Sequence, residues 1–278
     1  VIDGLLKSYE GVIGVDSAHI ELHEAGAIEF GGHKVLTVPQ KDGKISAAQI
    51  EKLVKDFYDD ANYEHMVMPG MVYISQPTEY GTLYSREELA VLSKVCRENH
   101  LPLYVDGARL AYALASPEND VTLTDLAEFS DVFYIGGTKC GALFGEAVVI
   151  PQKGRIPHFF TIIKQHGALL AKGRIAGIQF GELFTDGLYQ RIGKPAMEAA
   201  EQIKAALKKY GYQLSLDTPT NQIFCIVSND VMKKIAQDVE FGFWEKYDET
   251  HSVIRFATSW ATTMEDTQKL IQILEKNK

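Results

Sequence analysis

The sequence predicts an α/β protein with a mostly parallel sheet covered by helices. Short apolar runs rich in β-branched and aromatic residues, such as Leu101–Val105 and Val132–Ile135, have the length and composition of buried strands. Between residues 11 and 135 these runs alternate with segments whose apolar residues recur at helical spacing. This alternation is typical of parallel strands joined by helical crossovers. Ala147–Pro151 follows the last of these strands after a loop, and we expect it to return antiparallel.

The first half of the chain supplies the other strand and helix pairs. Strands are predicted at Gly11–Asp16, His33–Pro39 and Met71–Ser75. Two helices are predicted from capping boxes at Ser46–Gln49 and Ser85–Glu88, in which the first and last side chains satisfy each other's backbone N–H groups. The apolar stripes that should face the core are Ile50, Leu53, Val54 and Phe57 in one helix and Leu89, Leu92, Val95 and Cys96 in the other.

Two further segments of this half are expected to be helical. His23–Ile28 should form a short helix that leaves Glu24 near the end of the preceding strand. Ser116–Glu128 contains four acidic residues and should present a solvated face, with a helix beginning near Thr124 or Asp125.

The sequence divides into a large domain, residues 1–190, and a small α+β domain, residues 191–278. The helical pattern breaks around Asp186–Lys194, and Pro195 then opens a helix as a first-turn proline. Thr263 should cap a last helix, Met264–Glu275. The small-domain strands are predicted at Tyr212–Leu216, Gln222–Val227 and Val253–Thr258.

The composition excludes several classes of protein. A net charge of -9 argues against nucleic acid or an anionic membrane as a partner. No apolar run approaches the roughly 20 residues that span a bilayer, and no signal peptide pattern precedes the fold. The three cysteines lack metal-ligand spacing, so we expect no metal site and a reducing, cytoplasmic setting. Cys140 could be reactive, although a small buried residue is the favoured interpretation.

An acidic residue and a lysine follow two of the predicted strands. Asp106 follows Leu101–Val105, and Lys139 comes shortly after Val132–Ile135. Ligands of open α/β sheets bind outside the carboxyl ends of the strands, so both side chains should reach one edge. The lysine stands among Gly136, Gly137, Gly141 and Gly145, which let the backbone bend and a planar ligand approach.

These two residues suit pyridoxal 5'-phosphate (PLP). A lysine amine can lose its proton and form a Schiff base with an aldehyde. A carboxylate facing a pyridine nitrogen holds it protonated, which keeps the ring an electron sink. The alternative is that Asp106 caps a helix starting near Gly107 and that Lys139 is a solvated loop lysine. The pair on this strand pattern favours PLP.

The sequence resembles the threonine aldolase and β-eliminating lyase family of fold-type I PLP enzymes. The resemblance rests on VDGARLAYAL, on Thr138-Lys139, on DSAHIELHEAGAIE near the start and on VIRFAT near the end, so it covers nearly the whole chain. It implies an aspartate aminotransferase-like large domain. Val1–Tyr9 resembles the end of the helix that follows the family's phosphate-binding turn, so we expect the sequence to lack the family's N-terminal segment.

The resemblance also implies a role for individual residues. His19 would stack on the cofactor ring, and Thr138 and Arg174 would contact the cofactor. Arg109, expected one turn into the helix that follows Asp106, and Arg255 would bind the substrate carboxylate, which suits a planar guanidinium. The alternatives are a turn residue for His19, a surface ion pair for Arg109 and an edge-strand charge for Arg255. Lys164 and Lys172 would be adjuncts at most, and solvated side chains are favoured for both.

One position departs from the family. The loop after Met71–Ser75 carries a histidine in threonine aldolases, a candidate base for the substrate hydroxyl, and Glu79 matches it here. A carboxylate can act as a base when its surroundings raise its pKa. Glu79 could also be an exposed loop residue, and Tyr80 or Tyr84 could line the pocket.

The expected activity is aldol cleavage of a β-hydroxy-α-amino acid, of the threonine or allo-threonine type, to glycine and an aldehyde. Lys139, His19 and Glu79 would be the catalytic residues. One alternative is a PLP-dependent β-eliminating lyase, and another is a non-catalytic protein with the PLP fold. By analogy with the family we expect a homodimer or homotetramer.

Overall fold

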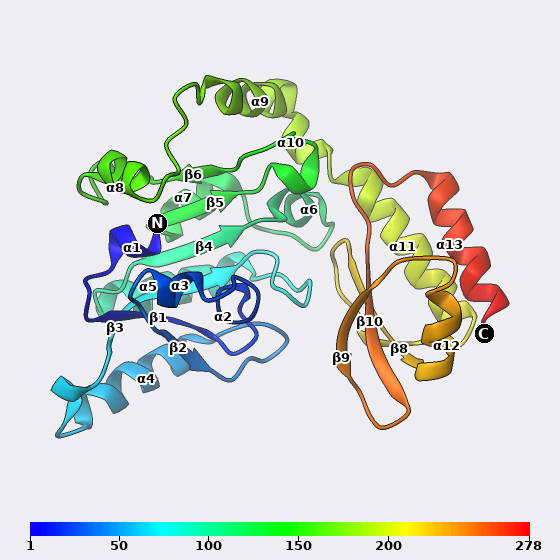
Figure 1. Cartoon of the computed structure of the whole chain (residues 1–278), viewed down its shortest axis with the longest axis horizontal. Coiled ribbons are helices and arrows are strands. Elements are labelled where there is room, and N and C mark those ends of the chain that lie inside the picture. The colour runs from blue at the N-terminus through cyan, green and yellow to red at the C-terminus, as the bar shows by residue number, and fades with distance from the viewer.

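The computed structural model describes residues 1–278 and contains two separate sheets (Figure 1). The larger sheet has six strands in the order β2-β1-β3-β4-β5-β6. Strands β1 to β5 run parallel, and β6 pairs antiparallel with β5, as the sequence predicts. The strands are β1 (Glu10–Val15), β2 (Val35–Val38), β3 (Met68–Ser75), β4 (Leu103–Gly107), β5 (Val132–Ile135) and β6 (Ala147–Val149).

Three of the helices around this sheet begin where a side chain satisfies their free N–H groups. Ser46 and Ser85 form the predicted capping boxes, and Thr122 forms a third. The predicted stripes face the core, with Leu53 partly buried and the other seven residues buried. The helices are α1 (Ile2–Leu5), α2 (His19–Leu22), α3 (Ala27–Phe30), α4 (Ala47–Asp59), α5 (Arg86–Glu98), α6 (Leu110–Ala115) and α7 (Leu123–Phe129), with 3₁₀ turns η1 (Tyr63–His65) and η2 (Thr138–Cys140).

The smaller sheet is antiparallel, in the order β7-β8-β10-β9, and lies against helices on the other side of the molecule (yellow to red in Figure 1). Thr263 caps the last helix as predicted. Its elements are α11 (Lys194–Lys209), β7 (Gln213–Leu216), β8 (Gln222–Ser228), α12 (Asn229–Ile235), β9 (Gly242–Lys246), β10 (His251–Ala257) and α13 (Met264–Lys276).

Two helices that follow β6 are largely exposed and pack against the larger core through a few residues, Leu183 among them. Figure 1 shows α8 (Phe159–Gln165) and α9 (Arg174–Phe184) above the large sheet, followed by η3 (Thr185–Gly187) and α10 (Leu188–Arg191). Ile175 and Ile178 of α9 are exposed. This helix therefore presents apolar side chains to solvent.

The core forms two hydrophobic clusters, one for each sheet, and α11 contributes to both. Ala196 and Met197 pack in the larger cluster, whereas Ile203 and Leu207 pack in the smaller one. The boundary expected between residues 190 and 191 falls within α10, and the division into two domains stays a prediction.

The structure corrects several sequence-based expectations. His23–Ile28 is not one helix: Ala25 and Gly26 adopt left-handed φ angles of 51° and 72°, which end α2 and precede α3. Arg109 stands just before α6 as its N-cap rather than one turn inside it. Asp125 is not solvated, because it is buried and accepts hydrogen bonds from Thr122 and Arg86.

Two C-terminal elements also differ from expectation. The break at Asp186–Lys194 contains α10, a single helical turn. The edge strand β9 was not predicted; it begins with a glycine, and its two adjacent aromatic residues are followed by two charged ones, so it lacks the alternation typical of a strand.

All three cysteines, Cys140 included, are buried and unpaired. None of the helices is both long and apolar enough to cross a membrane. No group of three or more His, Cys, Asp or Glu side chains is arranged to hold a metal ion.

Candidate active site

Asp106 and Lys139 line the same cleft at the carboxyl ends of adjacent strands. Asp106 is in β4, where it pairs with Tyr134 of β5, and Lys139 is in the turn η2 that follows β5. Since β4 and β5 are parallel neighbours, their ends present both side chains at one edge. The cleft holds about 530 Å³ of empty space, including its opening to solvent. Its lining consists of His19, Glu24, Ser75, Pro77, Thr78, Glu79, Asp106, Ala108, Arg109, Tyr134 and Lys139.

Both oxygens of the Asp106 carboxylate are held by hydrogen bonds. The Tyr73 hydroxyl donates to Oδ2 at 2.6 Å, and the backbone N–H of Ala108 donates to Oδ1 at 2.8 Å. Burial, followed by the negative charge of Asp106, raises the pKa of Tyr73 well above its ordinary value, so its hydroxyl remains a donor. The carboxylate is therefore fixed in place at the tip of β4.

Lys139 has an amine that loses its proton more readily than an exposed lysine does. Desolvation of its amine end, followed by the positive charge of Arg109, lowers the pKa of Lys139, although the residue as a whole reaches solvent. Asp106 and Glu146 oppose that change. An amine of lowered pKa is a better nucleophile near neutral pH, which suits addition to a carbonyl group.

The loop around Lys139 is held by tyrosines from two other helices. Tyr189 donates a 2.8 Å hydrogen bond to the carbonyl of Gly136, and Tyr112 donates one to the carbonyl of Lys139. The Tyr112 hydroxyl also accepts a 3.1 Å hydrogen bond from the N–H of Trp260, in the loop after β10. Tyr112 thus joins the Lys139 loop to the small sheet.

Glu79 is a partly buried acid rather than an exposed loop residue. Its Oε1 accepts hydrogen bonds from the N–H of His19 at 3.0 Å and from the Ser75 hydroxyl at 2.6 Å. Burial raises the pKa of Glu79, and the charge of Asp106 adds to this, while the two hydrogen bonds oppose it. A carboxylate with a raised pKa is a stronger base than an ordinary glutamate, which suits proton transfer.

His19 begins α2 and lines the cleft beside Glu24. Its Nδ1 lies 2.6 Å from Oε1 of Glu24. A carboxylate at Nδ1 favours the form in which that nitrogen carries a proton, and it restrains the imidazole plane. The ring is thus oriented at one wall of the cleft.

The charges of the two arginines repel each other, but only Arg109 lines the cleft. Burial, followed by the positive charge of Arg255, lowers the pKa of Arg109, which lies in the cleft. Arg255 is in β10, which pairs with strands on both sides, so the edge-strand interpretation is wrong. It donates a 3.1 Å hydrogen bond to Gln222, and its guanidinium lies 5.2 Å from the Trp244 ring centre.

The structure does not bring Arg174 into this cleft. Arg174 is the first residue of α9 and is exposed, as are Lys164 and Lys172. Thr138 is exposed beside Lys139, and its hydroxyl donates to Glu146. The cofactor contacts assigned to Thr138 and Arg174 stay predictions.

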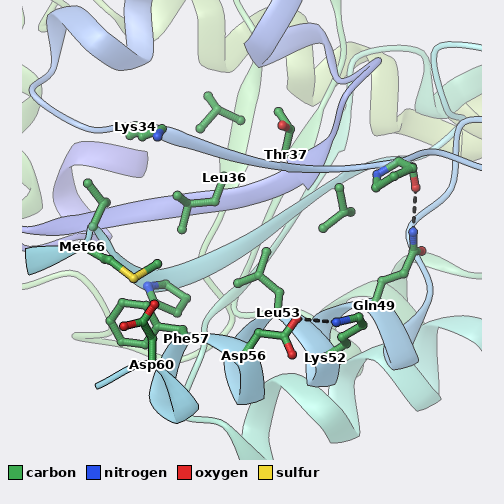
Figure 2. A pocket seen from close by; sticks show the side chains of 15 residues that line it. Lys34, Leu36, Thr37, Gln49, Lys52, Leu53, Asp56, Phe57, Asp60 and Met66 are labelled. Carbon is green, nitrogen blue, oxygen red and sulfur yellow. Dashed lines mark hydrogen bonds and ion pairs between the residues drawn. The ribbon is translucent and has the colours of Figure 1, made fainter. Parts of the chain in front are cut away.

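A second groove, with about 1290 Å³ of empty space including its opening to solvent, lies between the edge strand β2 and α4. Figure 2 shows the side chains of Leu36 and Leu53 between these two elements. The Lys52 amine in this groove is paired with Asp56 on the next turn of the same helix. The groove lacks the combination of carboxyl, amine and imidazole groups that the strand-end cleft has, so the cleft is the candidate active site.

Comparisons with known proteins identify the family of this chain. The family model described as "Beta-eliminating lyase" matches residues 2–230. The chain belongs to the beta-eliminating lyase family. The prediction of this family from the sequence is therefore confirmed.

The curated relatives of this family member include two bacterial enzymes. A low specificity L-threonine aldolase of Pseudomonas sp. (strain NCIMB 10558) is 30% identical over 265 residues, which are 94% of this chain and 74% of that protein. One from Pseudomonas aeruginosa is 29% identical and covers 96% of this chain and 76% of its own length.

Solved structures share the fold of this chain. A threonine aldolase of Leishmania major superposes with a TM-score of 0.94 at 41% identity, covering 99% of this chain and 79% of that one. Aspartate aminotransferase of Thermus thermophilus shares the fold, with a TM-score of 0.72 at 12% identity over 100% of this chain and 76% of that one. The predicted aspartate aminotransferase-like fold is confirmed.

Several residues around the site were not predicted from the sequence. Tyr73 is two positions before the end of β3, on the same face as Ser75, and this period of two was a usable signal. Glu146, Tyr112 and Trp244 had no such signal, because their partners are far along the chain or depend on how the loops close.

Proposed function

We propose that this chain cleaves a β-hydroxy-α-amino acid of the threonine type to glycine and an aldehyde, with PLP as cofactor. The observation that carries the proposal is the meeting of the Asp106 carboxylate and the Lys139 amine in one cleft. The threonine aldolases among the relatives support the choice of substrate.

The residues of the cleft fit PLP at two of its groups. The Lys139 amine suits the aldehyde, and the fixed carboxylate of Asp106 suits the pyridine nitrogen. Bound there, PLP would supply an electron sink that withdraws electron density from the Cα of the amino acid. The His19 imidazole, restrained by Glu24, would pack against the ring.

The arginines would hold the substrate. Arg109 in the cleft and Arg255 beside it would both bind the α-carboxylate of the amino acid. Two guanidinium groups would fix the orientation of the substituents at the Cα of the bound amino acid. This orientation decides which bond at Cα can break.

Glu79 would move the proton of the reaction. Its carboxylate would take the proton from the β-hydroxyl oxygen, so that the oxygen forms the aldehyde carbonyl as the Cα–Cβ bond breaks. The raised pKa of Glu79 then favours keeping that proton until it returns to the glycine product. General base catalysis of this kind contributes about 10²–10⁴-fold to a rate.

The test measures acetaldehyde and glycine from L-threonine and L-allo-threonine in the presence of PLP. Lys139→Ala and Asp106→Ala should abolish both products, and Glu79→Gln should lower kcat by about 10²–10⁴-fold. Borohydride reduction should leave a pyridoxyl group on the peptide containing Lys139. A label on another peptide would overturn the site.

β-Elimination is a second candidate, because Glu79 stands where threonine aldolases carry a histidine. Serine or cysteine would then give pyruvate and ammonia, and threonine would give no acetaldehyde. A non-catalytic role would be supported if PLP produced no visible absorbance and no labelled peptide.

We also propose a homodimer or homotetramer that works in the cytoplasm. The exposed apolar residues Ile175, Ile178 and Leu170 around α9 support self-association, since a second copy would remove them from water. Three unpaired cysteines support a reducing compartment.

A further inference from the structure

Both oxygens of the Glu146 carboxylate accept hydrogen bonds from the loop that carries Lys139. Its Oε2 accepts the backbone N–H of Gly137, and its Oε1 accepts the Thr138 hydroxyl. The N–H of Thr138 points between the two oxygens, 3.4 Å from each. One side chain thus satisfies three donors on the two residues that directly precede Lys139.

These contacts close a loop whose two ends, at Gly137 and Gly145, are already in contact. A Cβ on Gly137 would lie 2.9 Å from the carbonyl oxygen of Gly145, so only glycine permits this approach. Glu146 follows Gly145 and precedes the first residue of β6. The carboxylate therefore ties the start of β6 to the turn after β5.

The charge of Glu146 also reaches the groups around the amine. Arg109 and Arg255 lower the pKa of Lys139, whereas Asp106 and Glu146 raise it. The negative charge of Glu146 also contributes to raising the pKa values of Tyr134, Cys140 and Tyr189, after burial. Glu146 thus supplies one of the two negative charges that counter the arginines.

We propose that Glu146 is a positioning residue that closes the Lys139 loop and fixes where the amine enters the cleft. It touches neither the substrate nor the cofactor in the proposed reaction, and acts through Gly137 and Thr138. The inference rests on the proposed function in one respect only, namely that the Lys139 amine reacts with the PLP aldehyde. The contacts themselves can be tested in the cofactor-free chain.

Two variants separate the shape of Glu146 from its charge. Glu146→Gln keeps an oxygen acceptor of the same length without the charge, and Glu146→Ala removes every acceptor. Glu51→Gln is the matched control, because Glu51 is an exposed glutamate of α4.

The first measurement is amide hydrogen exchange of the peptide covering residues 136–141. We expect exchange at least about tenfold faster in Glu146→Ala, because the N–H groups of Gly137 and Thr138 lose their acceptor. Glu146→Gln should fall between Glu146→Ala and the parent, and Glu51→Gln should match the parent.

The second measurement is the acylation of Lys139 by acetic anhydride across pH, relative to exposed Lys153 in the same sample. Removing a negative charge favours the neutral amine, so Glu146→Gln should raise this ratio by more than about twofold at pH 8. A glutamate whose charge does not reach the amine would leave the ratio unchanged.

The proposal is overturned if Glu146→Gln shows the same hydrogen exchange and the same acylation as the parent. If Glu146→Ala does not fold, Glu146→Gln alone decides the test. If the proposed function is wrong, the parent and all variants fail alike to bind PLP or release acetaldehyde. Exchange and acylation are read without PLP, so the two failures are distinguishable.

Discussion

The Tyr73 hydroxyl donates a 2.6 Å hydrogen bond to Oδ2 of Asp106, from one strand of the parallel sheet to the next. Tyr73→Phe leaves that carboxylate with the Ala108 N–H as its remaining donor. We expect the free energy of unfolding to fall by about 1.5–3 kcal/mol, the usual value of a hydrogen bond to a charged group. Urea unfolding measures it, with exposed Tyr58→Phe as control. Equal stability of the two variants would contradict this role.

Glu79 should make the stability of the chain depend on pH. Burial raises its pKa above the ordinary value of 4.5, so the folded chain holds that proton more tightly than the unfolded chain does. The stabilisation is complete below about pH 4.5 and is lost as pH rises through the raised value. Glu79→Gln should therefore flatten this decline in urea unfolding between pH 4.5 and 8. A slope equal to that of Glu51→Gln would refute the assignment.

Arg255 should matter for binding the substrate more than for the chemistry. Arg255→Gln removes a guanidinium whose hydrogen bonds to a carboxylate are worth about 1.5–3 kcal/mol. We expect KM for L-threonine to rise about 10–150-fold, with a smaller change in kcat. Arg255→Lys should restore part of the loss. Lys234→Gln, a charge removal on exposed α12, is the control, and a parent-like KM in Arg255→Gln would exclude this role.

Gly136 should be intolerant of a side chain. A Cβ there would lie 2.1 Å from the carbonyl oxygen of Ala108, where the ends of β4 and β5 meet. Gly136→Ala should destabilise the chain by about 1–3 kcal/mol and reduce Lys139 labelling by PLP and borohydride. Gly14→Ala is the control, because its Cβ would make only ordinary contacts, the nearest at 3.6 Å. Similar melting temperatures for both variants would count against this packing.

The apolar face of α9 should hold copies of the chain together. Ile178 is 66% exposed, and Ile178→Glu would place a charge where a partner should pack. We expect sedimentation velocity to show smaller particles for this variant than for the parent. Val91→Glu, at 47% exposed in α5, should leave the assembly unchanged. If the parent itself sediments as a monomer, the proposed assembly is wrong.

Sequence patterns predicted those helices and strands whose formation depends on interactions between residues close together in the chain. The serine caps at Ser46 and Ser85 were identified because both partners of each capping box lie within four residues. A helix was expected at His23–Ile28, where the chain instead turns between α2 and α3, because the left-handed turn at Ala25 depends on a non-glycine residue that seldom adopts it.

The sequence by itself determined the α/β class, the family and the placing of Asp106 and Lys139 at strand ends. Periodicity and short motifs are properties of neighbouring residues, and parallel strands share one edge wherever they lie in the sheet. Only the tertiary structure decided that Tyr73 holds Asp106, that Glu146 closes the Lys139 loop and that Arg174 lies outside the cleft. Such contacts depend on strand register and loop closure, which the folded chain sets through packing between distant residues.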